Sequence, residues 1–192
     1  MGRKAYFQNE DFLNAAVQII ANDGLGALTI AALAKRVNAP VGSVYHRFPS
    51  RDALLAEVWL NIIESFQKEF LKKLQDDGLQ ATLACLQWVR QHPHEARIML
   101  LYRIHDLTSD KWPEDMQKRA LRLANELIEG VTAFTKKQFG RVTKETMDRV
   151  TFAIYDAPIG IIRRYLRENK VPPVSVNELI RETYEAVIVN AK

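Results

Sequence analysis

Hydrophobic residues recur along most of this 192-residue chain at intervals of three and four, which is the spacing of one face of an α-helix. No segment shows the regular alternation of polar and apolar residues that a half-buried β-strand would have. The pattern therefore predicts an all-α protein of about nine helices. The early helices are short and the later ones long, so we expect an N-terminal three-helix domain at 1–50 and a C-terminal helical bundle domain at 51–192.

Capping residues and helix breakers indicate where these helices begin and end. The first helix is expected from about Asn9 to Gly24, and Thr29 is expected to cap the second. The third runs from Val41 to about Phe48, after which Ser50 caps a long fourth helix. The remaining helices are expected near 51–74, 79–91, 95–105, 113–140, 143–169 and 176–189. A proline at position 158 should bend the eighth helix, at 143–169.

The segment 29–48, TIAALAKRVNAPVGSVYHRF, predicts two short helices joined by a tight turn. This arrangement is typical of a helix-turn-helix, in which the second helix enters the DNA major groove and the first crosses the backbone. The turn requires a residue that tolerates positive φ, and Asn38 is one of the few types other than glycine that do. Small Ala34 allows the two helices to approach closely. The segment therefore indicates DNA binding.

Charge is concentrated in the same part of the chain. The formal net charge of +4 is too small to identify a nucleic-acid partner. From Gly24 to Arg51, however, there is no acidic residue, and this stretch contains Lys35, Arg36, Arg47 and Arg51. A cation in the first turn of a helix opposes the helix dipole, so a phosphate docked beside Arg51 would explain its position.

Within this context, the segment Phe12–Val58 resembles the N-terminal domain of TetR-type repressors. The matching residues are Thr29-Ile30, Leu33-Ala34, the stretch Gly42-Ser43-Val44-Tyr45-His46, Phe48-Pro49-Ser50 and Ala53-Leu54-Leu55. The resemblance covers about a quarter of the chain, and the rest follows the family only in helix number and length. It implies a ligand-responsive transcriptional regulator, a repressor that a small-molecule inducer releases from a palindromic double-stranded DNA operator.

The resemblance also implies individual DNA contacts. Phosphate contacts are expected from Thr29, Tyr45, His46 and Arg51, base-edge contacts from Val41, Gly42 and Ser43, and a further contact from the basic segment at Arg47. Two positions depart from the family pattern: Asn38 stands where a glycine is frequent, and Pro40-Val41 stands where Ser-Lys is frequent. Without that lysine, we expect Val41 to touch a thymine methyl group.

The last two predicted helices carry broad apolar faces. In the eighth helix the small residues Ala153, Ala157 and Gly160 recur at four- and three-residue spacing, which permits close helix packing. The pattern fits an intramolecular seam of a bundle. The resemblance implies instead a homodimer formed by these two helices, which would present two reading helices to a symmetric operator. The expected interface residues are Ala153, Ala157, Gly160, Ile161, Leu179, Thr183, Ala186 and Val187.

An effector pocket within the bundle is likewise implied by the resemblance. Such sites are mostly apolar, with a few polar groups that orient the ligand. The candidate lining residues are Trp59, Phe66, Trp88, Met99, Tyr102, Arg103, His105, Phe152, Tyr155 and Asp156. Each of them has an alternative role as ordinary core or solvated surface.

Metal and catalytic sites are not expected. His92 and His94 flank a proline at a helix break and have no second cluster at ligand spacing, so we expect no metal and no cofactor. His105-Asp106 lacks a nucleophile in a recognisable setting, and we therefore expect no enzyme. A protein-binding adaptor is the other alternative, but it leaves Arg51 unexplained.

Cysteine usage and hydropathy bear on the compartment. Cys85 is the one cysteine of the sequence, so an intrachain disulfide is excluded, and its apolar surroundings predict a buried thiol. No apolar run approaches the ~20 residues that span a bilayer. We therefore expect a cytoplasmic protein without a membrane partner.

Overall fold

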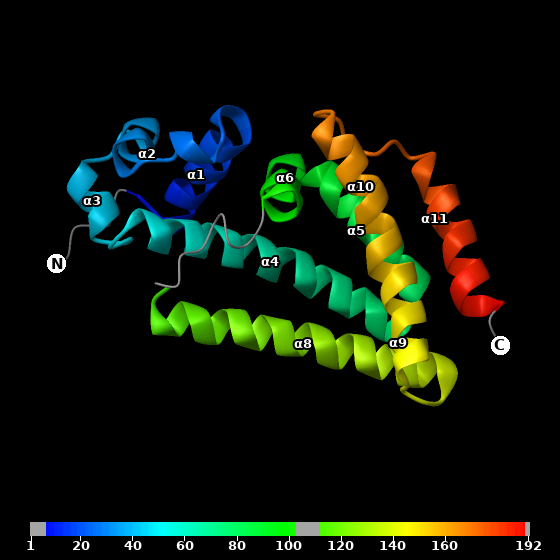
Figure 1. The fold of residues 1–192 in the computed structure, drawn as a ribbon. Helices are drawn as coiled ribbons and strands as arrows, with labels where there is room; N and C mark the ends of the chain where they lie inside the picture. Colours follow the sequence, from blue (N-terminus) through cyan, green and yellow to red (C-terminus); the bar gives the residue numbers. More distant parts are fainter. Residues whose placement is uncertain (1–6, 103–111, 191–192) are drawn as a thin grey trace.

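The computed structural model describes residues 7–102 and 112–190, and all regular structure within these ranges is helical, as predicted (Figure 1). We call residues 7–50 the head and the other described residues the body. The head contains α1 (Asn9–Asp23), η1 (Leu25–Ala27), α2 (Ile30–Val37) and α3 (Val41–Tyr45). The body contains α4 (Arg51–Asp76), α5 (Gly78–Gln91), α6 (Pro93–Leu101), α8 (Glu114–Phe139), α9 (Lys144–Thr151), η2 (Phe152–Asp156), α10 (Ala157–Arg167), α11 (Val176–Tyr184) and η3 (Glu185–Val189).

The three helices of the head share one small apolar core. Phe12 of α1, Leu33 of α2 and Val44 of α3 have no exposed surface. The ring of Phe48 meets that of Phe12 edge-on, with centroids 6.3 Å apart. Burial of these side chains holds the short helices together, because helices of five to eight residues are not stable by themselves in water.

The core of the head continues into the body. Leu54, Leu55 and Val58 of α4 are buried in the same cluster as the apolar residues of α1 and α2. Helix α1 also packs against α6. The change from short to long helices at residue 50 is therefore not a break in the core.

Helices α4 and α8 run side by side along the body (Figure 1). Arg119 of α8 forms ion pairs with Glu57 and Glu64 of α4, and its hydrogen bond lowers the pKa of Glu64. Farther along, the Nε2 of the buried Gln67 donates to the carbonyl oxygen of Leu123 at 2.5 Å. These contacts fix the position of α4 along α8, because apolar packing alone is less directional.

A π-helical turn, η2, joins α9 to α10 in one continuous helix. Proline in a helix interior has no N–H group, and its ring clashes with the carbonyl four residues before it. Here the turn before Pro158 is widened, and the amide of Ala157 donates to the carbonyl oxygen of Phe152. At Pro158, where the sequence predicts a bend, the structure has a wide π turn before the proline, after which the helix resumes.

Some helix limits differ from the predicted ones. Helix α3 ends at Tyr45, and the amide of Phe48 still donates to the carbonyl of Val44 in the turn that follows. Helix α6 begins at Pro93, two residues earlier than expected, because a proline at the first helical position leaves no amide unpaired. Its expected continuation to residue 105 lies partly outside the described residues. Pro113 precedes α8 instead of starting it.

Gly78 lies where α5, α8 and α11 meet. It is the first residue of α5 and is buried, and a Cβ atom there would collide with the ring of Phe134 and the hydroxyl of Tyr184. Burial raises the pKa of that hydroxyl to about 12, so it is neutral at physiological pH. The junction is therefore a position where the close approach of three helices requires a residue without a side chain.

We expect Gly78→Ala to lower the free energy of unfolding by about 1–3 kcal/mol, because the added methyl group overpacks this junction. Urea unfolding followed by circular dichroism measures the effect. Gly26→Ala is the matched control, since a Cβ at Gly26 meets no atom within 4 Å. Equal stability of the two variants would contradict the prediction.

Candidate functional site

The segment Ile30–Tyr45 forms two helices joined by a tight turn, as the sequence predicts. Thr29 caps α2, with its Oγ1 accepting from the amide of Ala32 at 3.0 Å. Asn38 ends the helix in the left-handed region, at φ 58° and ψ 41°. Ala34 is buried at this junction. The special conformation at Asn38 turns the chain sharply enough for α3 to pack on α2.

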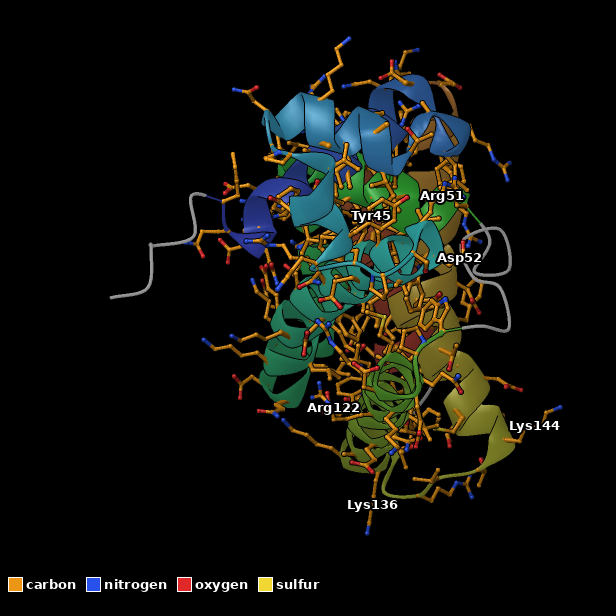
Figure 2. The ribbon with its side chains drawn as sticks, turned by 90° about the vertical axis from the view of Figure 1, so that its left-hand side faces the viewer. Tyr45, Arg51, Asp52, Arg122, Lys136 and Lys144 are labelled. Carbon is orange, nitrogen blue, oxygen red and sulfur yellow. The ribbon has the colours of Figure 1, made fainter. Side chains whose placement is uncertain are left out.

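One face of this pair of helices is open to solvent. Val41 is 45% exposed and Tyr45 54% exposed, and Gly42 and His46 are also exposed, while Ser43 is half-buried. Figure 2 looks toward the head, and Tyr45 lies near the start of α4, where Arg51 is labelled. Large apolar and aromatic side chains that remain exposed on a rigid helix are available to a partner. The residues expected to contact DNA on α3 therefore lie where a duplex can reach them.

Arg51 has an internal role that the sequence did not reveal. Its Nε donates to the carbonyl of Leu28 and its Nη2 to that of Leu25, both at 2.7 Å. These carbonyls supply the negative partners that make a cation in the first turn of α4 favourable. The structure thus corrects the explanation that required a phosphate there, and a DNA contact from Arg51 would use its remaining N–H groups.

Arg47 is also engaged within the head. Its Nη2 donates to the carbonyl of Phe7 at 2.8 Å and its Nη1 to that of Ser43 at 3.0 Å. The guanidinium carbon lies 5.0 Å from the centre of the Phe12 ring. The sequence placed Arg47 among the DNA-binding residues on charge alone, but charge does not show which basic side chains are held by carbonyls.

Lys35 and Arg36 of α2 are the exposed cations of the helix-turn-helix. They belong to the acid-free stretch noted in the sequence, yet they were not among the predicted contact residues. Their exposure is the signal that distinguishes them from Arg47 and Arg51. Exposed cations near a reading helix attract the phosphate backbone at long range.

A mostly apolar cavity of about 160 Å³ lies inside the body. Helix α4 supplies one wall, and α5, α6, α8, η2 and α10 supply the others. The lining residues are Trp59, Ile63, Phe66, Gln67, Phe70, Cys85, Met99, Leu100, Leu127, Ile154, Tyr155, Ile159 and Arg163. Cys85 is buried in this apolar wall, as predicted, and burial raises the pKa of its thiol to about 12.

The expected pocket residues separate into three groups. Trp59, Phe66, Met99 and Tyr155 line the cavity. Trp88 is buried behind Phe66, with ring centroids 5.2 Å apart, while Tyr102, Phe152 and Asp156 do not line it. Arg103 and His105 lie outside the described residues.

The sequence missed several residues of the cavity. Gln67 and Arg163 are its added polar groups, and Arg163 also donates from Nε to the carbonyl of Leu100 at 3.1 Å. Both lie on amphipathic helices, where a polar residue is usually solvated surface. Nothing in their spacing distinguishes them, because the cavity is assembled from helices far apart in the sequence.

A second apolar hollow, of about 240 Å³, adjoins the first. It lies between α8 and the helix formed by α9 and η2, and it includes Ile128 and Met147. The two hollows share Phe70, Leu127, Ile154 and Tyr155 as lining residues. The apolar lining is therefore continuous from the interior of the body toward its surface.

The residues expected at a dimer interface lie on the helices α10 and α11 and their π turns, at the side of the body away from the head (Figure 1). Leu179 is 51% exposed, and Gly160 and Ala186 are also exposed. Ala157, Ile161, Thr183 and Val187 are half-buried. Ala153 of the π turn η2, in contrast, is buried in the core, so it does not belong to the exposed face.

Two classes of site can be checked against the described residues. Within 7–102 and 112–190, no three His, Cys, Asp or Glu residues lie close enough together to hold a metal ion. In the same ranges, no helix is both long and apolar enough to cross a membrane.

Comparison with known proteins gives matches at two levels. Residues 12–58 match the family model of bacterial regulatory proteins of the tetR family. No curated protein matches the sequence.

Solved structures match over almost the whole chain. A transcriptional regulator from Rhodococcus sp. Rha1 has a TM-score of 0.73 at 17% identity, covering 96% of this chain and 97% of its own. FadR from Bacillus subtilis, solved in complex with stearoyl-CoA, has a TM-score of 0.70 at 9% identity, with 96% and 100% covered. A TetR family transcription regulator from Marinobacter aquaeolei VT8 has a TM-score of 0.66 at 15% identity, with 93% and 94% covered.

At these identities the solved structures establish the fold, and the match over residues 12–58 identifies the DNA-binding domain. Residues 12–58 thus form a DNA-binding domain of the kind found in bacterial regulatory proteins. The N-terminal domain of the chain is therefore similar to that of the bacterial regulatory proteins of the tetR family, and the remaining helices complete a fold like that of solved TetR-family regulators.

Proposed function

We propose that this regulator is a cytoplasmic, ligand-responsive repressor that binds a palindromic operator as a homodimer and is released by a small-molecule inducer. One observation carries the proposal: a single helix, α4, both holds the head and lines the apolar cavity. Its first residue, Arg51, donates to the carbonyls of Leu25 and Leu28. Five of its later residues, from Trp59 to Phe70, face the cavity.

This arrangement couples the cavity to the head mechanically. Helix α4 has 26 residues, so it extends over about 39 Å as one rigid element. The carbonyls that Arg51 holds belong to the short segment Leu25–Leu28, which leads into Thr29, the residue that caps α2. A ligand that displaces α4 in the cavity therefore moves the start of the helix-turn-helix with it.

The energy that such a switch requires is substantial. Changing the DNA-free fraction of the protein from 1% to 99% takes about 5.5 kcal/mol of differential ligand binding between the two states. In a dimer, the displacement changes the separation of the two α3 helices, which must match successive major grooves ~34–36 Å apart. A well-filled cavity in each subunit can supply this energy through buried apolar surface.

The lining of the cavity favours an elongated apolar effector with a polar or anionic end. The walls are aromatic and aliphatic, and the apolar lining continues into the second hollow through Phe70 and Tyr155. Among the described residues that line the inner cavity, Arg163 is the cationic one, and it has N–H groups beyond its bond to Leu100. The similar fold of FadR from Bacillus subtilis was solved in complex with stearoyl-CoA, which has an apolar chain and an anionic end.

We expect Ile63→Trp to weaken binding of stearoyl-CoA, used as a probe, at least tenfold, because the larger side chain fills the inner cavity. Isothermal titration calorimetry measures the dissociation constant. Leu121→Trp is the control, since Leu121 is 63% exposed on α8 and lines neither hollow. The proposed effector class would be wrong if the wild-type protein did not bind the probe, or if both variants bound it equally.

We expect Tyr45→Phe to weaken binding to duplex DNA roughly tenfold, because the lost hydroxyl would donate to a charged phosphate oxygen. The effect should be similar on random and operator duplexes, and the salt dependence should not change, since no cation is removed. Fluorescence anisotropy at two salt concentrations measures both quantities. Tyr165→Phe, on α10, should bind DNA as the wild-type protein does, and a loss of the same size there would refute a specific contact from Tyr45.

The dimer is supported by the exposed face of α10 and α11. Leu179 contributes a large apolar side chain to this face, and Gly160 leaves open space, since a Cβ there meets no atom within 4 Å. Small and apolar residues together allow two helices of one protomer to pack closely against their counterparts. This face also lies far enough from the head to leave both reading helices free (Figure 1).

We expect Leu179→Glu to shift the protein from dimer to monomer in sedimentation velocity, because the interface would bury a carboxylate without a partner. The monomer should also lose affinity for an operator selected from a random DNA pool. Val174→Glu is the control, because Val174 is 71% exposed in the segment between α10 and α11. A Leu179→Glu variant that sedimented as a dimer would place the interface elsewhere.

A further inference from the structure

A third cavity, of about 200 Å³, lies where the head meets the body. The end of α1, the first turns of α6 and the end of α10 form its walls. The lining residues are Ala21, Asn22, Pro93, His94, Arg97, Leu166, Asn169, Lys170 and Val171. None of them lines the apolar cavity, and the volume is well above the roughly 10–15 Å³ that one water molecule needs.

This third cavity is lined by polar and basic residues, in contrast to the apolar cavity. Arg97 and Lys170 carry positive charge, His94 is an imidazole, and Asn22 and Asn169 offer amide N–H donors. No acidic residue is among the described lining residues. Cationic and amide donors around one space that has no carboxylate are suited to an anion.

Arg97 is the most informative of these residues. Six arginines of the described chain are half-buried, and five of them, Arg47, Arg51, Arg90, Arg119 and Arg181, donate to a carbonyl or pair with a carboxylate. Arg97 is half-buried as well, but it has no such partner in residues 7–102 and 112–190. A partly buried guanidinium without an acceptor is unfavourable, so this position suggests a ligand that provides one.

The start of α6 adds to the positive potential. Pro93 and His94 are its first two residues, and no side chain caps its first amides. The positive end of the helix dipole thus lies at the wall of the cavity, beside Arg97. This feature strengthens the site that the unpaired guanidinium defines.

The nearby acids do not occupy the site. Glu168 pairs with Lys170 at 3.1 Å, and Glu95, which does not line the cavity, lies 3.9 Å from His92. Asp23 is exposed at the end of α1 and does not line the cavity. The Nζ of Lys170 keeps further N–H donors beyond its bond to Glu168.

We infer that this cavity binds a small oxyanion, a free phosphate or the phosphate group of a small metabolite, independently of the apolar effector. The anion accepts from Arg97, His94 and Asn22, which lie on the body and on the head. It therefore ties α1 to α6 and stabilises one position of the head on the body. Because α3 lies on the far side of α1 from α6, this site is separate from the face that would meet DNA (Figure 1).

The test is a titration of the full chain with inorganic phosphate, followed by ¹H–¹⁵N chemical shifts, with potassium chloride at equal ionic strength as reference. We expect saturable shifts at Asn22, His94 and Asn169 that chloride does not produce. Arg97→Gln should raise the dissociation constant for phosphate at least tenfold. Arg167→Gln, an exposed residue of α10 that does not line the cavity, should leave it unchanged.

Lys170→Gln provides a second variant whose folding is not in question, because Lys170 is exposed; it should weaken phosphate binding severalfold. Shifts that do not saturate, or equal weakening in Arg97→Gln and Arg167→Gln, would overturn the inference. A short random duplex is added in a further arm. Displacement of phosphate from these residues by the duplex would identify the DNA backbone as the source and would also overturn a small-anion site.

Discussion

The hydrogen bonds from Arg51 to the carbonyls of Leu25 and Leu28 are the interaction on which the rest of the structure depends. They tie the first turn of α4 to the short segment before Thr29, where the helix-turn-helix begins. A bidentate arginine holds both distance and orientation, which apolar packing does not do. The position of the reading helices is therefore determined by α4.

Beyond its first turn, α4 is held by its contact with α8. Apolar packing brings the two helices together, while Arg119 and Gln67 set their relative position through directed bonds to Glu57 and Leu123. Gln67 also lines the apolar cavity. The residue that fixes α4 against α8 thus also lines the cavity in which we propose that an effector binds.

The structure contains two cavities of contrasting chemistry. One is apolar and is enclosed by α4 and the helices of the body, and the other is basic and lies between α1, α6 and α10. Helix α6 contributes to both, with Met99 and Leu100 in the first and His94 and Arg97 in the second. Because α6 has only nine residues, the two cavities lie within a few helical turns of each other.

The sequence by itself determined the helical fold, the caps at Thr29 and Ser50, the turn at Asn38 and the buried thiol of Cys85, because these depend on local spacing and residue type. Only the tertiary structure decided which basic side chains are free. Nothing in the sequence distinguishes Arg47, Arg51 and Arg97. In the structure, Arg47 and Arg51 donate to backbone carbonyls that are distant in the chain, whereas Arg97 has no such partner among the described residues. Partners brought together by folding are not encoded in local periodicity, and for the same reason Gln67 and Arg163 escaped prediction as cavity residues while Ala153 was wrongly expected at the surface.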